Sequence, residues 1–369
     1  EAQATSNPGL LSEKQRRFLY LTAAITGGVI MIVEILGAKM LAPYFGTSHF
    51  VWTAQIAVTL VALAAGYYFG GRLVDRSTQL GRIYGSILAA AIYLVLAVLA
   101  IEPVAYGCMH FKLAVGSLLA SVFLFFIPLA LLAMVGPFFI RVLTISVAGV
   151  GGNVGRLSAI STLGSFVGTL LIGYALIPFL PNSITMLLTS GLLMTVAAVY
   201  FFTWARGKAA AVSVTLVLGS ALGIYTGYQS NRPHFEHVEE LARYNSDFGL
   251  LQVLQEKNGP RRYYLNDYLT QNIYDADEKK STAMFTYMLY HLARAYTPSI
   301  QDVLCIGLGV GIVPMDFARD GARVEVVEIN PAVVPLARQF FGFEPQRLKL
   351  HFGDGRYFLN QTGHRYDTV

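Results

Sequence analysis

The sequence predicts a multi-span α-helical membrane domain followed by a Rossmann-like α/β domain, with a small β-rich subdomain between them. The 369 residues are 54% hydrophobic and only 13% charged, whereas soluble domains carry roughly 25% charged residues. Apolar stretches dominate up to about Tyr228, and charges become frequent from Arg232 onward. From Asp302, strand and helix patterns alternate, as in a parallel sheet with crossover helices. We therefore predict a transmembrane domain at 1–228, a connector with the β-rich subdomain and a helix at 229–298, and the α/β domain at 299–369.

Seven stretches of the first domain are apolar enough to cross a bilayer, which takes about 20 residues. They lie at 18–40, 50–70, 83–101, 113–135, 155–179, 183–203 and 209–228. The segment 137–152 is apolar but short and carries Arg141, so we interpret it as interfacial or re-entrant. An eighth span at that segment remains an alternative.

Basic residues gather in alternate loops of this domain. They precede the first predicted span and follow the second, fourth and sixth: Lys14, Arg16, Arg17, Arg72, Arg76, Arg82, Arg141, Arg156, Arg206 and Lys208. The positive-inside rule predicts a cytoplasmic N-terminus. We expect the membrane to be the inner (plasma) membrane. Seven spans would place the last domain outside, whereas an adenosine-type cofactor is normally inside, so its side stays open. Because these loops explain much of the net charge of +5, no nucleic-acid partner is predicted.

Glu34 is the candidate functional residue of the membrane domain. A charged carboxylate within a span costs about 2.5–3.5 kcal/mol on insertion scales. The alternative is a protonated or internally hydrogen-bonded glutamate that fixes helix packing. Lys39 is five residues on and therefore on another helical face, so we expect it to extend toward the interface rather than pair with Glu34.

The middle region begins as a polar connector near 229–240. Short strands are predicted at 249–255 and 261–266 with a turn at Gly259 and Pro260, and a helix at 281–296 with Pro298 just beyond its end.

The α/β domain carries a nucleotide-binding pattern. A strand at 303–306 breaks into Gly307, Gly309 and Gly311, a second strand ends at Glu328, and a third ends just before Asp354. The glycines allow a sharp turn close to a ligand, and a carboxylate ending the second strand can accept hydrogen bonds from ribose hydroxyls. The G-x-G-x-G spacing favours an S-adenosyl ligand over a dinucleotide, with Asp354 near the adenine.

Cys108 and Cys305 are the two cysteines of the sequence. Two cysteines in such different segments cannot build a disulfide or zinc framework. We therefore expect no metal cofactor.

On these residues the C-terminal half resembles spermidine synthases, and the whole chain resembles the membrane-fused, spermidine-synthase-like proteins of bacteria. The residues that carry the resemblance are 266–271 (similar to a Leu-Asp-Gly-x-x-Gln stretch), the glycine turn, 327–331 and 353–356, with 34–46, Trp52 and 66–76 in the membrane half. The resemblance implies an S-adenosylmethionine-dependent methyltransferase-type fold. It also implies decarboxylated S-adenosylmethionine as donor and transfer of an aminopropyl group to an amine such as putrescine.

The resemblance also implies a role for each site residue. Gln271 would lie near donor and acceptor, the three glycines would line the donor's tail, Glu328 would hold the ribose and Asp354 the adenine. The family's catalytic aspartate follows the fourth strand, which is predicted to begin near Tyr366, so its position lies beyond Val369. The expected partners are the amine acceptor and the bilayer, and a homo-oligomer stays open.

Two positions depart from the family pattern. In the family, the helix before the first strand carries His-Glu, whereas Thr286 and Tyr287 align here. The family's glycine turn carries an aspartate that meets the donor's amine, but here that position is Val310. A methyltransferase that uses S-adenosylmethionine itself is therefore an alternative. A second alternative is a transporter or membrane scaffold with a non-catalytic, nucleoside-sensing domain, because Glu34 is intramembrane and 70–76 resembles a loop of major facilitator transporters.

Overall fold

The chain folds into two compact units, Glu1–Arg232 and Pro233–Val369. The computed structural model describes residues 11–144, 150–230 and 237–369. The boundary between the units lies close to the predicted domain boundary at 228.

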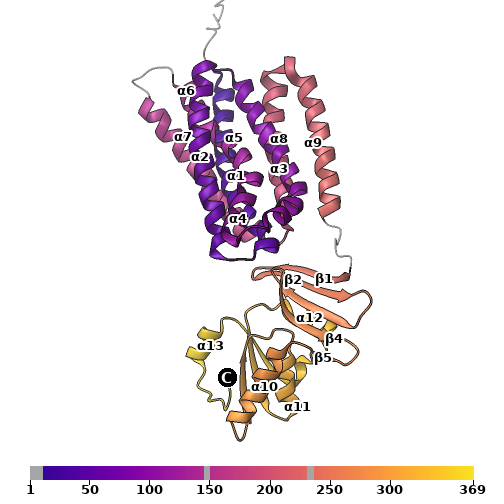
Figure 1. Cartoon of the computed structure of the whole chain (residues 1–369). Coiled ribbons are helices and arrows are strands. Elements are labelled where there is room, and N and C mark those ends of the chain that lie inside the picture. Colours follow the sequence, from indigo (N-terminus) through magenta and orange to yellow (C-terminus); the bar gives the residue numbers. More distant parts are fainter. Residues whose placement is uncertain (1–10, 145–149, 231–236) are drawn as a thin grey trace, which may run out of the picture. The chain divides into compact units, whose positions relative to one another are not determined.

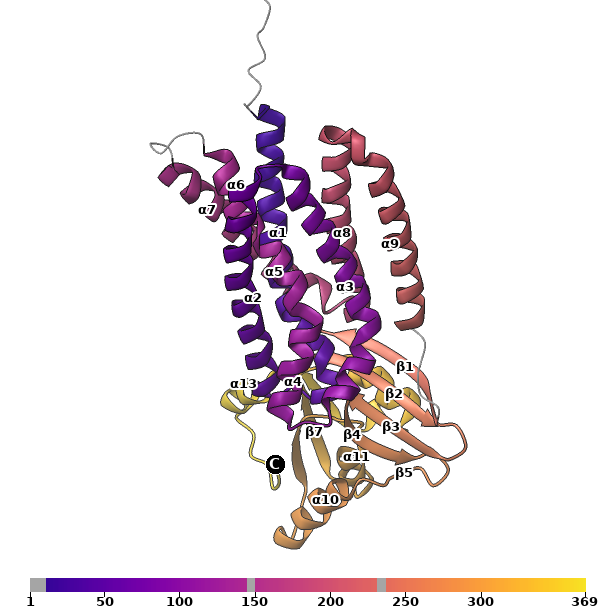
Figure 2. The same ribbon diagram turned by 45° about the horizontal axis from the view of Figure 1, so that its top comes forward.

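The first unit is helical. Its long helices lie side by side in both views (Figures 1 and 2). The helices are α1 (Glu13–Phe45), α2 (His49–Arg76), α3 (Leu80–Cys108), α4 (Leu113–Ser121), α5 (Ile127–Ala133), α6 (Val135–Leu143), α7 (Val150–Leu170), α8 (Asn182–Trp204) and α9 (Ala209–Ser230), with π-helical turns η1 (Val122–Phe126) and η3 (Leu171–Leu176) and a 3₁₀ turn η4 (Arg206–Lys208).

Within the described residues, seven helical segments are long and apolar enough to cross a membrane. They are Glu13–Phe45, His49–Arg76, Leu80–Cys108, Leu113–Leu143, Val150–Leu176, Asn182–Trp204 and Arg206–Gln229. Each of the seven predicted spans overlaps one of them.

The fourth segment runs further than predicted. We interpreted 137–152 as interfacial or re-entrant, but residues 137–143 belong to α6, which continues the fourth segment to Leu143. Pro137 does not end the segment, because it stands in the first turn of α6, where its missing N–H needs no partner. Residues 145–149 lie outside the described residues, and α7 begins at Val150.

Close approach of small residues joins the helices. A side chain at Gly164 of α7 would collide with the backbone of Ala24 in α1, and a Cβ at Gly168 would lie 2.5 Å from the carbonyl oxygen of Gly28. Small residues at a four-residue spacing let two backbones pack directly against each other. Since residue numbers rise together on both helices at these contacts, α7 runs parallel to α1.

The second unit begins with an antiparallel five-stranded sheet in the order β1-β2-β3-β4-β5. Its strands are β1 (Val238–Ser246), β2 (Gly249–Glu256), β3 (Arg261–Asn266), β4 (Leu269–Asp275) and β5 (Lys280–Ser281). The sequence predicted β2 and β3. It missed β1, which starts inside the predicted polar connector, because this strand is rich in charged residues and its pairing with β2 stabilises it.

The α/β part follows in the predicted order. Helix α10 (Met284–Tyr296) precedes β6 (Asp302–Ile306), α11 (Ile312–Arg319), β7 (Arg323–Glu328), α12 (Val333–Phe340), the 3₁₀ turn η5 (Pro345–Arg347), β8 (Lys349–Phe352) and α13 (Gly355–Gln361). Strands β6, β7 and β8 are parallel neighbours in that order. Thr368 forms an isolated parallel bridge with Val303 of β6.

The two sheets of this unit share one core. Leu251, Tyr264 and Tyr274 of the antiparallel sheet belong to the same buried cluster as Val303 and Val326 of the parallel sheet. The antiparallel sheet and the α/β part therefore hold their loops in a fixed relation to each other.

Candidate functional site

The glycine turn follows β6 at the carboxyl edge of the parallel sheet. Gly307, Gly309 and Gly311 have φ values of +92°, +57° and +84°, a region that other residues rarely adopt. The N–H of Gly307 still donates to the carbonyl oxygen of Val327 on β7 at 2.8 Å. Gly311 starts α11, and a side chain there would also collide with the ring of Phe343. The turn thus needs glycine at the predicted positions.

Glu328 lies directly behind this turn. Its side chain is 7% exposed. One carboxylate oxygen accepts from the N–H of Leu308 at 2.7 Å, and the other accepts from the N–H of Asn330 at 2.8 Å. The carboxylate at the end of β7 therefore fixes the glycine turn, a structural role that the sequence did not reveal. A carboxylate has about four acceptor positions, so two remain.

Asp354 follows β8 and reaches the same edge. The N–H of Gly353 donates to the carbonyl oxygen of Glu328 at 3.0 Å. A Cβ at Gly355 would lie 2.5 Å from Cγ2 of Ile306, at the end of β6. The loops after all three parallel strands therefore meet, as predicted for Gly307, Glu328 and Asp354.

The Asp354 carboxylate already has partners. It caps α13 by accepting from the N–H groups of Arg356 and Tyr357 at 2.8 and 3.2 Å, and it forms an ion pair with the Arg356 guanidinium at 2.9 Å. The Arg356 side chain and these backbone N–H groups lower the pKa of Asp354 to about 2. The carboxylate is ionised at neutral pH, and a ligand would meet it beside a highly exposed arginine.

Gln271 comes from the antiparallel sheet. Tyr264 pairs with Asn272 and Leu265 with Thr270, so Gln271 is the extra residue of a β-bulge between β3 and β4. Bulges often redirect a side chain next to a functional site. Gln271 is exposed, whereas Tyr264, opposite the bulge, is buried. Burial raises the pKa of Tyr264, and the charge of Glu328 raises it further, which indicates that the bulge region lies near Glu328.

A polar bridge fixes this arrangement. The Asn330 amide donates to Oγ of Ser246 at 2.9 Å, and Ser246 donates to the carbonyl oxygen of Gly249 at 2.7 Å. Gly249 and Leu250 adjoin the β3–β4 turn, where Asp267 accepts from the N–H of Leu250 at 3.0 Å. The sequence analysis did not predict Asn330 as a site residue, although it lies two positions after Glu328 within residues 327–331.

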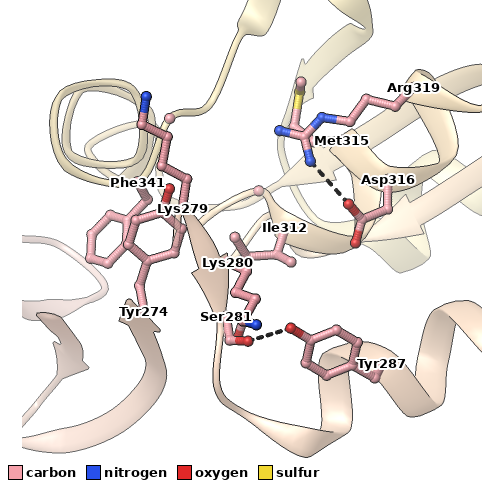
Figure 3. A pocket seen from close by; sticks show the side chains of 12 residues that line it. Tyr274, Lys279, Lys280, Ser281, Tyr287, Ile312, Met315, Asp316, Arg319 and Phe341 are labelled. Atoms are coloured by element: carbon pink, nitrogen blue, oxygen red, sulfur yellow. Dashed lines mark hydrogen bonds and ion pairs between the residues drawn. The ribbon is translucent and has the colours of Figure 1, made fainter. Parts of the chain in front are cut away.

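A pocket adjoins the last glycine of the turn (Figure 3). Tyr287 donates to the carbonyl oxygen of Ser281 at 2.5 Å on one side, and Asp316 pairs with Arg319 at 3.1 Å on the other. Lys279 and Lys280 also line it. Three cationic side chains against one carboxylate disfavour a positively charged amine, so the pocket does not fit the expected acceptor.

Val310 stands within the glycine turn, whereas Glu34 belongs to the helical unit. The Val310 side chain is 2% exposed and belongs to the buried core of the second unit. Glu34 is partly buried in α1 of the helical unit. Three or more His, Cys, Asp or Glu side chains arranged to hold a metal do not occur among residues 11–144, 150–230 and 237–369.

Comparison with known proteins agrees with this geometry. Residues 283–369 match the spermine/spermidine synthase domain family. The chain is 34% identical over 99 residues to spermidine synthase 2 of Datura stramonium, covering 25% of this chain and 31% of that protein. It is 31% identical over 100 residues to a polyamine aminopropyltransferase of Vibrio vulnificus, covering 25% and 33%.

A shorter stretch of the chain is similar to a methyltransferase. The chain is 46% identical over 75 residues to the eEF1A lysine and N-terminal methyltransferase of Danio rerio, covering 18% of this chain and 11% of that protein. The chain spans about a third of the length of the spermidine synthases it matches. Residues 283–369, which carry the parallel sheet and its glycine turn, are therefore similar to the spermine/spermidine synthase domain.

Proposed function

We propose that the chain is a membrane-bound aminopropyltransferase that takes decarboxylated S-adenosylmethionine as donor and an amine as acceptor. One observation carries the proposal. The three strand-end loops that would bind a nucleoside converge in the same stretch that matches the spermine/spermidine synthase domain. The named relatives are spermidine synthases and a polyamine aminopropyltransferase.

Each site residue has a role in this proposal. Glu328 uses its two remaining acceptor positions for the two ribose hydroxyls, while it keeps its bonds to Leu308 and Asn330. Asp354 accepts from the adenine amino group as Arg356 swings away. Gly307, Gly309 and Gly311 line the donor's tail, and Gln271 lies between donor and acceptor.

The reaction is a displacement at carbon. The acceptor's amine nitrogen forms a bond to the donor carbon next to the sulfonium, the carbon–sulfur bond breaks, and methylthioadenosine leaves with the electron pair. The site must orient the amine and accept its proton, which a carboxylate does well. In the family pattern that carboxylate follows the fourth strand.

Methyl transfer from S-adenosylmethionine is the second candidate. Val310 favours it, because a buried valine replaces the aspartate that would meet the amine of the decarboxylated donor. The similarity to a methyltransferase of Danio rerio also supports it. A carboxylate lost from a cationic-ligand site forfeits charge-assisted hydrogen bonds of about 1.5–3 kcal/mol each.

Titration of the purified chain with three ligands separates these functions. Decarboxylated S-adenosylmethionine, S-adenosylmethionine and methylthioadenosine are titrated separately, and turnover of 1,4-diaminobutane is then measured by methylthioadenosine release. Preferred binding of the decarboxylated donor with diamine turnover is expected. Preference for S-adenosylmethionine without diamine turnover would indicate methyl transfer. If none of the three ligands binds, the proposed enzymatic function is ruled out.

The proposal includes the bilayer as a partner. Seven apolar helical segments and the alternating basic loops support a multi-pass protein of the plasma membrane with a cytoplasmic N-terminus. Nucleoside binding without turnover of any amine or methyl acceptor would favour the other alternative, a transporter or scaffold with a sensing domain.

A further inference from the structure

Gln55 of α2 is an unusual residue for the interior of an apolar helical unit. It is 0% exposed, and both atoms of its amide lack a hydrogen-bond partner among the described residues. The amide lies over Gly37 of α1, where a Cβ would sit 2.7 Å from Nε2 and 3.1 Å from Oε1 of Gln55. Burying a side-chain amide without hydrogen bonds lowers the stability of the folded protein. A ligand that forms hydrogen bonds with the amide would offset this loss.

A second such group lies on the neighbouring helix. Ser121, at the end of α4, is 0% exposed, and its hydroxyl has no partner among the residues described. Gly66 of α2 lies against Ala130, and Gly70 against Met134, so α2 runs parallel to the fourth segment. About three helical turns before these contacts, α2 carries Gln55 and the fourth segment carries the region of Ser121. The contacts between α2 and α4 are consistent with this register.

The helix is irregular at this level. The π-helical turn η1 begins directly after Ser121. Tyr93 of α3 donates to the carbonyl oxygen of Phe123 in η1 at 2.6 Å. Single π-helical turns inside α-helices often mark functional sites.

Glu34 belongs to the same level. It precedes Gly37 by three residues and therefore shares a face of α1 with the glycine that supports Gln55. Helix α7 runs parallel to α1, and Gly168 lies against Gly28. Six residues beyond this contact, α1 carries Glu34 and the α7 segment has entered the second π-helical turn, η3. Contacts between α1 and η3 support this register.

Glu34 supplies a carboxylate to this part of α1. Lys39 lies on another face of α1, and the other basic residues of that helix, Lys14, Arg16 and Arg17, lie in its first turns. A carboxylate, an amide oxygen and a hydroxyl are all acceptors. An ammonium group offers three N–H donors and a compensating charge, which also offsets the cost of an intramembrane carboxylate.

We infer that Glu34, Gln55 and Ser121 form a binding site for an organic ammonium ion inside the helical unit. The site lies within α1, α2 and α4, and Glu34 carries its charge. It relies on the membrane placement proposed above but not on the transferase reaction.

Equilibrium binding of radiolabelled 1,4-diaminobutane to the full chain in detergent tests this site. Wild type is expected to show a saturable site that Glu34→Gln weakens roughly tenfold or more, as removal of a charge-assisted hydrogen bond requires. Glu102→Gln, a matched carboxylate in α3, leaves binding unchanged. Diamine binding at any site in the second unit would be unaffected by Glu34→Gln. The affinity of this variant for decarboxylated S-adenosylmethionine is also expected to equal that of wild type.

Gln55→Leu separates a binding role from a packing role. It removes a buried amide without partners, so the thermal stability of the helical unit stays equal or rises, while diamine binding weakens several-fold. No saturable binding by wild type, equal binding by Glu34→Gln or Gln55→Leu, or displacement by equimolar Na⁺ would each overturn the ammonium site.

Discussion

Glu328 has two tasks at one position. Its carboxylate holds the backbone of the glycine turn, and in the proposed function it also holds a ribose. The sequence indicated only the second task, because a carboxylate ending the second strand is a familiar nucleoside signal. The first depends on how the turn folds back over β7.

We expect Glu328→Ala to weaken nucleoside binding at least tenfold, since it removes charged hydrogen bonds of about 1.5–3 kcal/mol each. Calorimetric titration with methylthioadenosine measures this. Glu325→Gln is the matched control, because Glu325 lies on the same strand but pairs with Lys349 and His351. Unchanged affinity of Glu328→Ala would remove the ribose role.

The glycines of the turn should differ in what they tolerate. Gly309 has open space where a Cβ would lie, whereas Gly311 faces the Phe343 ring. Gly309→Ala is expected to cost about 1–2 kcal/mol for the left-handed backbone alone. Gly311→Ala adds an overpacking cost of about 1–3 kcal/mol. Urea unfolding of the second unit, followed by hydrogen exchange, compares them; equal losses would contradict the contact with Phe343.

At the scale of elements, short helix α13 depends on the charge of Asp354. The folded pKa of this carboxyl, about 2, lies below its ordinary value of 3.8. The stabilisation is therefore complete above about pH 4 and is lost as the pH falls toward 2.

Asp354→Asn should remove that pH dependence, because asparagine can still cap the helix but does not titrate. Circular dichroism and hydrogen exchange of residues 355–361 between pH 5 and 2 follow the change. An identical acid profile for both proteins would show that other carboxyls govern the helix.

The pairing of α1 with α7 rests on glycine. Gly164→Leu would drive a side chain into the backbone of Ala24, so we expect the helical unit to lose about 2 kcal/mol or more. Thermal unfolding in detergent measures the loss. Gly155→Leu, on the same helix with nothing near its Cβ position, should be tolerated; a comparable loss there would point to lipid or detergent effects instead.

At the scale of the whole molecule, the seven proposed crossings would place the two ends of the helical unit on opposite sides of the membrane. Lys14→Cys and Asp277→Cys, each in a chain with Cys108 and Cys305 replaced by alanine, report the two sides. Membrane-impermeant maleimide on sealed vesicles should label one and not the other. Labelling of both from one side would contradict seven crossings.

The positive-inside rule further predicts that the cysteine of Lys14→Cys lies on the cytoplasmic side of the membrane. The second unit would then lie outside, where an adenosine donor is not normally found. If Asp277→Cys is cytoplasmic instead, the donor argument outweighs the charge argument for this chain.

Much of the architecture could be predicted from the residue pattern alone. Long apolar stretches and the alternation of strands and helices are local features, so seven helical segments and the order β6–α11–β7–α12–β8 followed from them. The glycine spacing, Glu328 and Asp354 were predicted to meet, because carboxyl ends of parallel strands share an edge.

Only the tertiary structure decided the rest, since it depends on contacts between distant residues. The charged strand β1 forms because β2 pairs with it, and Gln271 becomes a bulge residue through the register of β3 and β4. Val310 is buried by its neighbours, and Gln55 lies over Gly37 with no hydrogen-bond partner for its side chain among the described residues, because α1 and α2 pack closely there. The sequence by itself determined that a helical domain precedes an α/β domain, and it indicated the residues that we propose for a nucleoside site. Packing decided which of those residues also hold the fold and where an apolar helical unit keeps polar groups.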